Sequence, residues 1–214
     1  MKLTRDDFLE RYEKGNLNIA LVGMSNIGKS YTAKRLAENY NFNLIEIDKL
    51  IQLDMGHKSL VDFAEWQGQP FSKGYAEREG RSIQLETLAT KKAILSKKNN
   101  TLIDTTGSVI YIDHSVLKKL TENFFIVYIQ VHNDHLKNLT SQYLSNPKPL
   151  IWKNFYRKIP EKTHIESLML CYPELLNARK KEYEKISDKI ISSAKVLNKI
   201  TSIDDIYKLL QPSN

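Results

Sequence analysis

Apolar residues gather in short runs that alternate with stretches of helical periodicity. The runs at 18–22, 42–48, 101–104, 124–131 and 189–192 are rich in branched or aromatic side chains and have the length of strands. Between these runs, apolar residues recur every three or four positions, as they do along a helix. Strands that alternate with helices predict an α/β fold, in which a central parallel sheet of about five strands is covered on both faces.

Helix-capping residues mark the first predicted helix. Thr4 precedes two acidic residues and Gly15 follows as a stop, so residues 1–16 are predicted to carry a short accessory N-terminal helix over 4–14. The other helical segments are predicted at about 31–40, 49–98 with breaks near 56 and 68–70, 114–121, 132–144, 166–187 and 202–210. Pro173 is expected to kink or split the helix that contains it.

Residues 145–164 show neither the alternation that is typical of a strand nor the spacing of three to four residues that is typical of a helix. This stretch contains three prolines among aromatic and basic side chains. A loop of this length is too long for an idle connection, and mobile lids are the usual reason for one. We therefore expect a single domain over residues 1–214, with a mobile lid at about 145–164.

Composition places the chain among globular proteins. Of its 214 residues, 41% are hydrophobic and 27% are charged, and no apolar run approaches the roughly 20 residues that cross a bilayer. The charged start of the sequence does not resemble a signal peptide, and the single cysteine, Cys171, fits a reducing compartment. We expect a cytoplasmic protein without a membrane partner.

Candidate chemistry begins directly after the first predicted strand. Residues 23–30 read Gly-Met-Ser-Asn-Ile-Gly-Lys-Ser, which is the complete P-loop pattern G-x-x-x-x-G-K-S. Such a turn at a helix N-terminus aims backbone N–H groups at phosphates, while Lys29 reaches the β- and γ-phosphates and Ser30 holds Mg²⁺. With ATP and Mg²⁺ as cofactors, the expected nucleotide-binding residues are Gly23, Met24, Ser25, Asn26, Ile27, Gly28, Lys29, Ser30 and Tyr31. The motif specifies the fold class as a three-layer P-loop NTPase sandwich.

Acidic residues end two other predicted strands. Glu46 and Asp48 close the second strand, and because side chains alternate along a strand, they are expected to point the same way. Asp104 closes the third strand in the manner of a Walker-B acid. Asp104 is therefore a metal candidate in addition to Glu46 or instead of it, and the sequence leaves open which of the two dominates.

The net charge of +7 raises a second hypothesis, a nucleic-acid-acting P-loop protein. Trp152, Phe155 and Tyr156 stand beside basic residues, a combination that can hold single strands by stacking. The basic residues are otherwise scattered and form no stripe, so nucleic acid is the less favoured partner. A third hypothesis is a regulatory module that binds a nucleotide but has lost catalysis.

Several spacings together resemble those of the shikimate kinase family of small-molecule P-loop kinases. Glu46-Ile47-Asp48 stands at the family's acid-x-acid motif, and Lys148-Pro149-Leu150-Ile151 stands at the Arg-Pro-Leu-Leu of its lid. Arg179 and Tyr183 match the family's Arg-x-x-x-Tyr near the end of the chain. The resemblance spans roughly residues 17–192.

This resemblance implies an ATP-dependent phosphotransferase that acts on a hydroxyl of a small metabolite, with shikimate as the first candidate. It implies that Lys29, Asp48 and Lys148 are catalytic: Asp48 orients the acceptor hydroxyl and accepts its proton, and Lys148 closes on the phosphates. It further implies that Arg179 pairs with the acceptor's carboxylate. Ser30 and Glu46 would bind the metal, with Asp104 as the alternative or additional acid.

Three positions depart from the family pattern. Thr105-Thr106-Gly107 replaces three glycines at the acceptor wall. Ala76 stands where a carboxylate-binding arginine belongs, with Arg78 or Arg81 as the candidate substitute. Glu46 replaces a shorter Asp. The expected acceptor contacts are Asp48, Arg78, Arg81, Thr105, Thr106, Gly107 and Arg179. A gluconate-, nucleoside- or nucleotide-type kinase stays open, and we expect a monomer or weak dimer.

Overall fold

The architecture is an all-parallel sheet wrapped by helices. The structure is a computed structural model that describes residues 2–56, 58–131, 136–145, 148–198 and 200–213. Within these residues five strands pair in the order β2-β3-β1-β4-β5, each pair parallel. They are β1 (Asn18–Val22), β2 (Asn43–Glu46), β3 (Thr101–Asp104), β4 (Phe125–Gln130) and β5 (Lys189–Ser192). The predicted α/β fold with a parallel sheet is confirmed.

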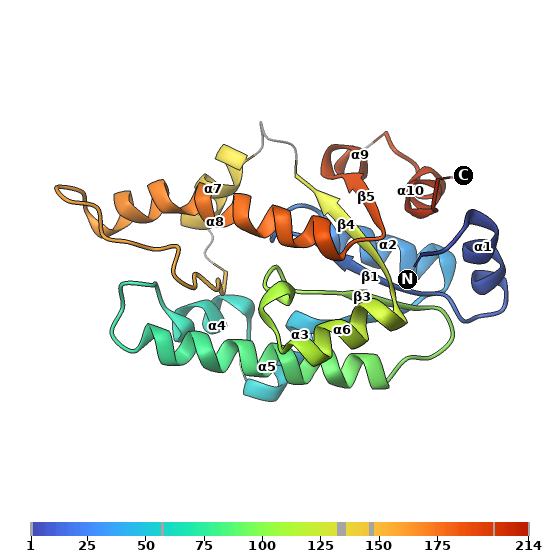
Figure 1. Ribbon diagram of the computed structural model, residues 1–214, viewed down its shortest axis with the longest axis horizontal. Coiled ribbons are helices and arrows are strands. Elements are labelled where there is room, and N and C mark those ends of the chain that lie inside the picture. Colours follow the sequence, from blue (N-terminus) through green and yellow to red (C-terminus); the bar gives the residue numbers. More distant parts are fainter. Residues whose placement is uncertain (1, 57, 132–135, 146–147, 199, 214) are drawn as a thin grey trace.

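Helices cover both faces of the sheet. Figure 1 shows α2 and α10 on one side and α3, α5 and α6 on the other. The helices are α1 (Arg5–Glu13), α2 (Lys29–Tyr40), α3 (Ile47–Met55), α4 (Leu60–Gln67), α5 (Tyr75–Leu95), the 3₁₀ turn η1 (Val109–Tyr111), α6 (His114–Asn123), α7 (Leu136–Ser145), α8 (His164–Ile186), α9 (Ser193–Leu197) and α10 (Ile203–Leu210). Pro173 lies inside α8 and does not split it. Among the described helices, none is both long enough and apolar enough to span a bilayer.

The apolar run of β1 explains its central position. Ile19, Ala20, Leu21 and Val22 are all fully buried. Ile19 lies opposite Leu102 of β3 on one side and Phe125 of β4 on the other. A parallel strand buried on both faces needs such a continuous apolar sequence. This placement fixes where the loop after Val22 emerges, at the carboxyl edge of the sheet.

The leading helix α1 packs on this framework, as predicted for an accessory helix. Thr4 and Asp7 form a reciprocal capping box that starts the helix. Phe8 is fully buried, and its ring meets that of Phe125 edge-on at a centroid distance of 5.5 Å. The ring of Tyr207 from α10 lies 6.1 Å from Phe8 on another side. The helix therefore ties the sheet to the last helix of the chain.

The second strand ends earlier than predicted, and this corrects the interpretation of its two acids. β2 stops at Glu46, which caps α3, and Asp48 lies in the first turn of that helix. The helical period starts at Ile47, because Ile47 and Ile51 are both buried one turn apart. Strand alternation therefore does not relate Glu46 to Asp48, and that step of the sequence argument is wrong.

The predicted lid segment is packed against the rest of the protein. Residues 148–163 contain no helix or strand, while residues 146–147 lie outside the described part of the chain. Trp152 has no exposed surface, and its ring contacts those of Tyr143, Tyr156 and Tyr172. The irregular backbone agrees with the sequence prediction, and the mobility of the segment stays a prediction.

Candidate active site

The P-loop sits between β1 and α2 with the geometry that its glycines allow. Gly23 has a φ of +140°, and a Cβ there would lie 2.7 Å from the carbonyl oxygen of Ile129. Gly28 caps α2 in the left-handed region. The buried Lys29 Nζ donates to the carbonyl of Met24 at 2.8 Å, so the ammonium is held against the loop. Burial lowers the pKa of Lys29, and the nearby carboxylates of Asp104 and Asp48 oppose this effect.

Asp104 and Ser30 form a corner suited to a divalent cation. Asp104 is buried, and its Oδ1 has no hydrogen-bond partner among the described residues. Burial raises the pKa of its carboxyl, an effect opposed by Lys29 and by a hydrogen bond with Ser30. An unpartnered buried carboxylate oxygen beside a hydroxyl provides the hard oxygen ligands that Mg²⁺ prefers.

Glu46 lies next to Asp104 but has other partners. The two residues are opposite each other in the β2–β3 register. The Glu46 carboxylate forms ion pairs with Lys49 and with Lys34, the latter at 3.7 Å. Because two lysines already compensate its charge, Glu46 is less available to a metal than Asp104 is.

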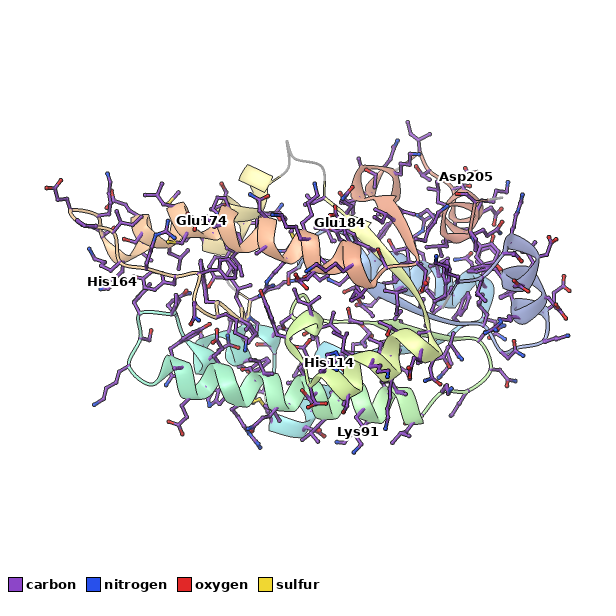
Figure 2. The ribbon with its side chains drawn as sticks, viewed as in Figure 1. Lys91, His114, His164, Glu174, Glu184 and Asp205 are labelled. Carbon is purple, nitrogen blue, oxygen red and sulfur yellow. The ribbon has the colours of Figure 1, made fainter. Side chains whose placement is uncertain are left out.

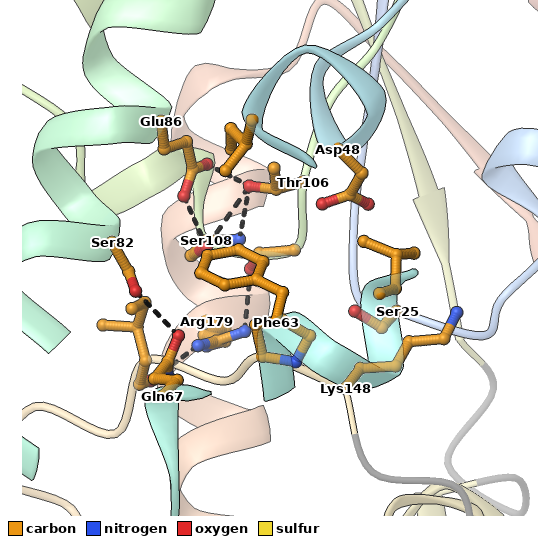
Figure 3. A pocket seen from close by; sticks show the side chains of 15 residues that line it. Ser25, Asp48, Phe63, Gln67, Ser82, Glu86, Thr106, Ser108, Lys148 and Arg179 are labelled. Atoms are coloured by element: carbon orange, nitrogen blue, oxygen red, sulfur yellow. Dashed lines mark hydrogen bonds between the residues drawn. The ribbon is translucent and has the colours of Figure 1, made fainter. Parts of the chain in front are cut away.

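A cavity beside the P-loop collects most of the predicted acceptor residues. It has about 470 Å³ of free space, part of it open to solvent. The end of β3, the start of α3, α4, α5, α8 and the segment after residue 147 surround it (Figure 3). Its walls include Ser25, Asp48, Thr106, Gly107, Lys148 and Arg179. Residues that are distant in sequence therefore meet here, as the sequence analysis predicted for these positions.

The carboxylate of Asp48 lies on the wall of the cavity that also includes Lys148 (Figure 3). Burial raises the pKa of Asp48, and the positive charges of Lys29 and Lys148 act in the opposite direction. A carboxyl with a raised pKa is a better proton acceptor than an ordinary aspartate once it is ionised. Asp48 therefore has both the position and the basicity that a hydroxyl-activating group needs.

Arg179 is a buried cation without a carboxylate partner among the described ion pairs. Only 1% of the residue is exposed. Its Nη1 donates to the carbonyl of Gly107 at 2.8 Å, and its Nη2 donates to that of Ile151 at 2.6 Å. Its Nε has no partner in the described part of the chain. Since a buried guanidinium is costly unless an anion compensates it, this wall is suited to an anionic group of a ligand.

Gly107 brings the P-loop and the acceptor wall into contact. A Cβ at this position would lie 3.0 Å from Ser25 Oγ and 3.2 Å from Ser25 N. The carbonyl of Gly107 also accepts hydrogen bonds from Arg179 and from the Tyr183 hydroxyl. One residue without a side chain thus joins the phosphate-binding loop to the wall that holds Arg179.

Three predicted acceptor residues do not reach the cavity. The Thr105 hydroxyl donates instead to the carbonyl of Leu21 at 2.8 Å, which ties β3 to β1. Arg78 donates to the backbone carbonyls of Gln67 and Lys73, and Arg81 is exposed with Gln84 as its partner. On α5 the side chains that face the cavity are Ser82 and Glu86, so positions 78 and 81 are turned away. Thr105, Arg78 and Arg81 therefore do not line this cavity, and their contact with the acceptor stays a prediction.

Four polar residues that were not among the predicted site residues also line the cavity. They are Gln67, Ser82, Glu86 and Ser108. A signal existed in the buried stripe of α5, where Tyr75, Glu79, Ser82, Glu86 and Ala89 recur at helical spacing. Polar residues within such a stripe indicate a buried polar site rather than a solvated face.

Glu79 holds the segment that follows Lys148. Its Oε1 accepts from the backbone N–H groups of Trp152 and Lys153, at 2.5 and 2.9 Å, and from the Tyr75 hydroxyl at 2.8 Å. Glu79 is itself 9% exposed. A single carboxylate thus anchors the base of the predicted lid to α5.

The aromatic residues that motivated the nucleic-acid hypothesis are not a stacking surface. Trp152 is fully buried, and Phe155 and Tyr156 pack against the core. Arg157 is paired through two hydrogen bonds with Glu174 on α8. Figure 2 shows charged side chains of both signs, such as those of Lys91 and Glu174, spread over different elements. The structure therefore removes the stacking surface from that hypothesis, which then rests on the net charge alone.

A second cavity adjoins the other side of the P-loop. Its lining combines Asn26 and Ile27 with Leu139 and Gln142 of α7 and with four residues at 193, 194, 197 and 198. A methyl of Leu197 would be 2.7 Å from a Cβ at Gly28, so this part of the chain covers the start of α2. The cavity is mainly apolar with a few amide groups, as expected for a flat heterocycle.

The sequence model of the shikimate kinase family matches residues 25–210. The chain belongs to the shikimate kinase family. A shikimate kinase of Sulfurihydrogenibium sp. is 29% identical over 151 residues, which cover 65% of this chain and 82% of the relative. A shikimate kinase of Clostridium botulinum (strain Loch Maree) is 27% identical over 180 residues, which cover 78% of this chain and 96% of the relative.

Solved structures of the shikimate kinase family share the fold. The shikimate kinase of Acinetobacter baumannii, in complex with shikimate, superposes with a TM-score of 0.64 over 94% of this chain and 95% of its own, at 18% identity. The shikimate kinase of Bacteroides thetaiotaomicron superposes with a TM-score of 0.62 over 92% of this chain and 99% of its own, also at 18% identity. These matches confirm the predicted P-loop fold class.

Membership of the shikimate kinase family makes this chain an ATP-dependent kinase that uses Mg²⁺ and a hydroxyl acceptor, as predicted. In the described part of the chain, no three His, Cys, Asp or Glu side chains converge on a metal site.

Proposed function

We propose that this kinase transfers the γ-phosphate of ATP to a hydroxyl of a small polyol that carries a carboxylate, with shikimate as the first candidate. The observation that supports this most is the presence of Asp48 and Arg179 in one cavity that also includes Ser25 of the P-loop. Asp48 provides a base for a hydroxyl, and Arg179 provides a cation for a carboxylate. The related fold from A. baumannii was solved with shikimate bound.

Asp48 would act on the acceptor hydroxyl. Its carboxylate orients the hydroxyl toward the γ-phosphate and takes the proton as the new O–P bond forms and the bond to the leaving ADP breaks. The raised pKa of Asp48 supports this role, since it moves the basicity of the carboxylate toward that of the reacting group. The positive charges of nearby Lys29 and Lys148 oppose this rise in the pKa and favour the ionised carboxylate.

Lys29, Lys148 and the P-loop amides would stabilise the phosphates. Lys29 gives up its contact with the Met24 carbonyl, a bond of 2.8 Å, when phosphate oxygens offer a better partner. Lys148 lines the acceptor cavity on the side of the lid segment. Closure of that segment would bring its cation to the transferring group and exclude water, which would otherwise be the acceptor.

Ser30 and Asp104 would hold the Mg²⁺ ion. The unpartnered Asp104 Oδ1 and its neighbour Ser30 fit such an ion, whereas Glu46 is engaged by two lysines. The bound metal supplies charge neutralisation on the β- and γ-phosphates. We further propose that the cavity between Asn26 and residues 193–198 receives the nucleotide base.

The test is ATP turnover by the purified protein with Mg²⁺, alone and with shikimate, followed by mass spectrometry of the product. We expect shikimate to stimulate ADP formation. Lys29→Ala should lower kcat/KM by at least about a hundredfold, because it removes a cation from the transition state. Asp48→Asn should lower kcat by a similar factor and leave ATP affinity unchanged.

Asp54→Asn is the matched control, since Asp54 lies on the same helix as Asp48 and is exposed. Its turnover should stay within about twofold of the wild-type value. Stimulation by another hydroxy acid instead of shikimate would keep the reaction and change the acceptor. Normal turnover in Lys29→Ala, or no phosphorylated product with any carboxylate-bearing polyol, would reject the proposal.

We also propose that the kinase works in the cytoplasm, where ATP is made available, as a monomer or weak dimer. The single cysteine, Cys171, is buried and free, which suits a reducing compartment. Sedimentation at micromolar concentration would test the expected state of association.

A further inference from the structure

Glu86 lies on the cavity wall, on the same side as Asp48 and away from Arg179 and Lys148 (Figure 3). We infer that Glu86, positioned by Thr106 and Ser108, is a specificity-determining residue that accepts a hydrogen bond from a second hydroxyl of the acceptor, one that is not phosphorylated. This inference rests on the proposed function and adds a contact that selects among carboxylate-bearing polyols.

The hydrogen bonds of Glu86 fix its carboxylate and leave it with free capacity. The residue is 3% exposed. Its Oε1 accepts from the Thr106 hydroxyl and its Oε2 accepts from the Ser108 hydroxyl at 2.6 Å. Each carboxylate oxygen can accept two hydrogen bonds, so each of the two oxygens has room for a donor from a ligand.

The side chains around Glu86 are satisfied within the protein. Thr106 Oγ1 donates to Glu86 and accepts from the backbone N–H of Ser108 at 3.1 Å. On the same wall, the Ser82 hydroxyl donates to the side-chain oxygen of Gln67 at 2.8 Å. Glu86 is therefore the group on this wall with the most acceptor capacity left for a ligand.

Glu86 has no Lys, Arg or His partner among the ion pairs of the described residues. A buried acid that only supported the wall would gain from a cation or be replaced by an amide, since an unpaired buried charge is costly. A carboxyl retained at a cavity surface under these conditions is explained by contact with a ligand. Burial raises the pKa of Glu86 to about 7, although the hydrogen bonds from Ser108 and Thr106 and the more distant charge of Arg179 act in the opposite direction.

The charges around the cavity explain why the ligand group at Glu86 is a hydroxyl rather than a carboxylate. The acids Asp48 and Glu86 lie on one side, and the cations Lys148 and Arg179 lie on the other (Figure 3). A carboxylate near Glu86 would be repelled, which directs it toward Arg179. Because Ala76 provides no second cation, this repulsion replaces part of the orienting effect of an arginine.

The protein would then recognise the acceptor through three contacts. Arg179 binds its carboxylate, Asp48 contacts the reacting hydroxyl, and Glu86 contacts a second hydroxyl. A site that hydrogen-bonds a substrate hydroxyl rejects analogues without that group far more strongly than an apolar wall does. The wall of Glu86, Thr106 and Ser108 should therefore distinguish acceptors that differ in one hydroxyl.

The experiment compares wild-type protein, Glu86→Gln and the control Glu77→Gln. Glu77 lies on the same helix and is exposed. Each protein is assayed with shikimate and with analogues in which one ring hydroxyl at a time is replaced by hydrogen. We expect the wild type to discriminate against one non-reacting deoxy analogue by tenfold or more in KM. Glu86→Gln should raise the shikimate KM about tenfold, leave the ATP KM within twofold and lose that discrimination.

Equal KM values and equal discrimination in wild type and Glu86→Gln would overturn the inference while leaving the proposed function intact. A rise in the ATP KM as large as that for shikimate would also overturn it, since it would indicate general disturbance. Ser108→Ala, which leaves the carboxyl in place but removes one hydroxyl that positions it, serves as the second variant if Glu86→Gln does not fold, and should raise the shikimate KM alone. If wild-type protein neither binds shikimate in calorimetry nor phosphorylates it or any other carboxylate-bearing polyol, the proposed function fails and the inference fails with it.

Discussion

Three acids surround the phosphate-binding loop, and their partners give them different tasks. Glu46 is compensated by Lys34 and Lys49. Asp104 is buried with one oxygen unpartnered among the described residues, and Asp48 faces the acceptor cavity. Their environments thus separate three similar carboxylates into one paired with lysines, a candidate metal ligand and a candidate base.

At this scale we predict that Asp104 dominates at the metal. Asp104→Asn should raise the Mg²⁺ concentration for half-maximal turnover by about tenfold or more, because it removes a charged oxygen next to Ser30. Glu46→Gln is the comparison variant and should shift this concentration by less than about twofold. The measurement is a Mg²⁺ titration at fixed ATP, with full chelation stopping turnover in both. A larger effect of Glu46→Gln would reverse the assignment.

The residues of the site were predictable from sequence only where a motif or a strand end fixes them. Lys29 and Asp48 follow from motifs, and Arg179 from a family spacing. Arg78 and Arg81 do not line the cavity, because the rotation of α5 about its axis depends on which of its faces packs, and this is decided by the tertiary structure. Glu86 was missed for the same reason, since an isolated Glu on a helix is usually solvated.

At the scale of elements, the segment after Lys148 depends on α5 for its position. Its irregular backbone makes few hydrogen bonds of its own, and Glu79 accepts two of its N–H groups. Trp152 anchors the same segment by burial among three tyrosines. Lys148 therefore lies four residues before a stretch of backbone that is anchored to α5.

Glu79→Gln should weaken the attachment of Trp152 and Lys153 to α5. The amide can accept from only one oxygen and brings a donor toward backbone N–H groups, so we expect about 1–3 kcal/mol less stability. Hydrogen exchange at Trp152 and Lys153 should accelerate, and kcat should fall because Lys148 is less well placed. Exchange measured by mass spectrometry, with Glu77→Gln as the control, checks this. Unchanged exchange at both amides would show that Trp152 alone holds the segment.

The element pattern could be predicted from sequence better than its boundaries. β3 and β5 have the predicted limits, because turn residues and polar caps bound their apolar runs. β2 is shorter than predicted, because an apolar residue at 47 is compatible with both a strand and a helix. The five-residue helix α9 was not predicted, since so short a helix shows no period and depends on tertiary contacts.

At the scale of the whole molecule, both substrate sites lie at the carboxyl edge of the sheet. The P-loop follows β1, Asp104 ends β3 with Thr106 and Gly107 just after it, and α3 begins where β2 ends. Parallel strands present all these ends on one side, which is where ligands of open α/β sheets bind. Position in the sheet thus accounts for the meeting of residues that are far apart in sequence.

The stability of the whole protein should depend on pH through Glu86. Its pKa is raised to about 7 in the fold, above the ordinary value of 4.5. Between these values the folded protein keeps a proton that the unfolded chain has released, so the free energy of unfolding falls as pH rises, by up to about 3 kcal/mol. At pH values above the pKa of Glu86 in the folded protein, Glu86 causes no further change in the free energy of unfolding.

Urea unfolding of wild type and Glu86→Gln between pH 5 and 8 measures this effect. The stability of the wild type relative to Glu86→Gln should fall up to about pH 7 and then level off. The comparison with Glu77→Gln should stay flat, because that side chain is exposed. A difference that is independent of pH, or that rises with pH, would contradict the assignment of a raised pKa to Glu86.

The hydrogen bonds at Gly107 also set the order in which the protein can mature on the ribosome. Its carbonyl is held by Arg179 and Tyr183, which are translated more than seventy residues later. The strands β2, β3, β1 and β4 can pair as soon as residues up to 130 have left the exit tunnel. A nascent chain at that stage already has its P-loop but lacks the α8 side of the acceptor pocket. Competence for phosphate transfer to the acceptor therefore cannot arise before α8 has been synthesised.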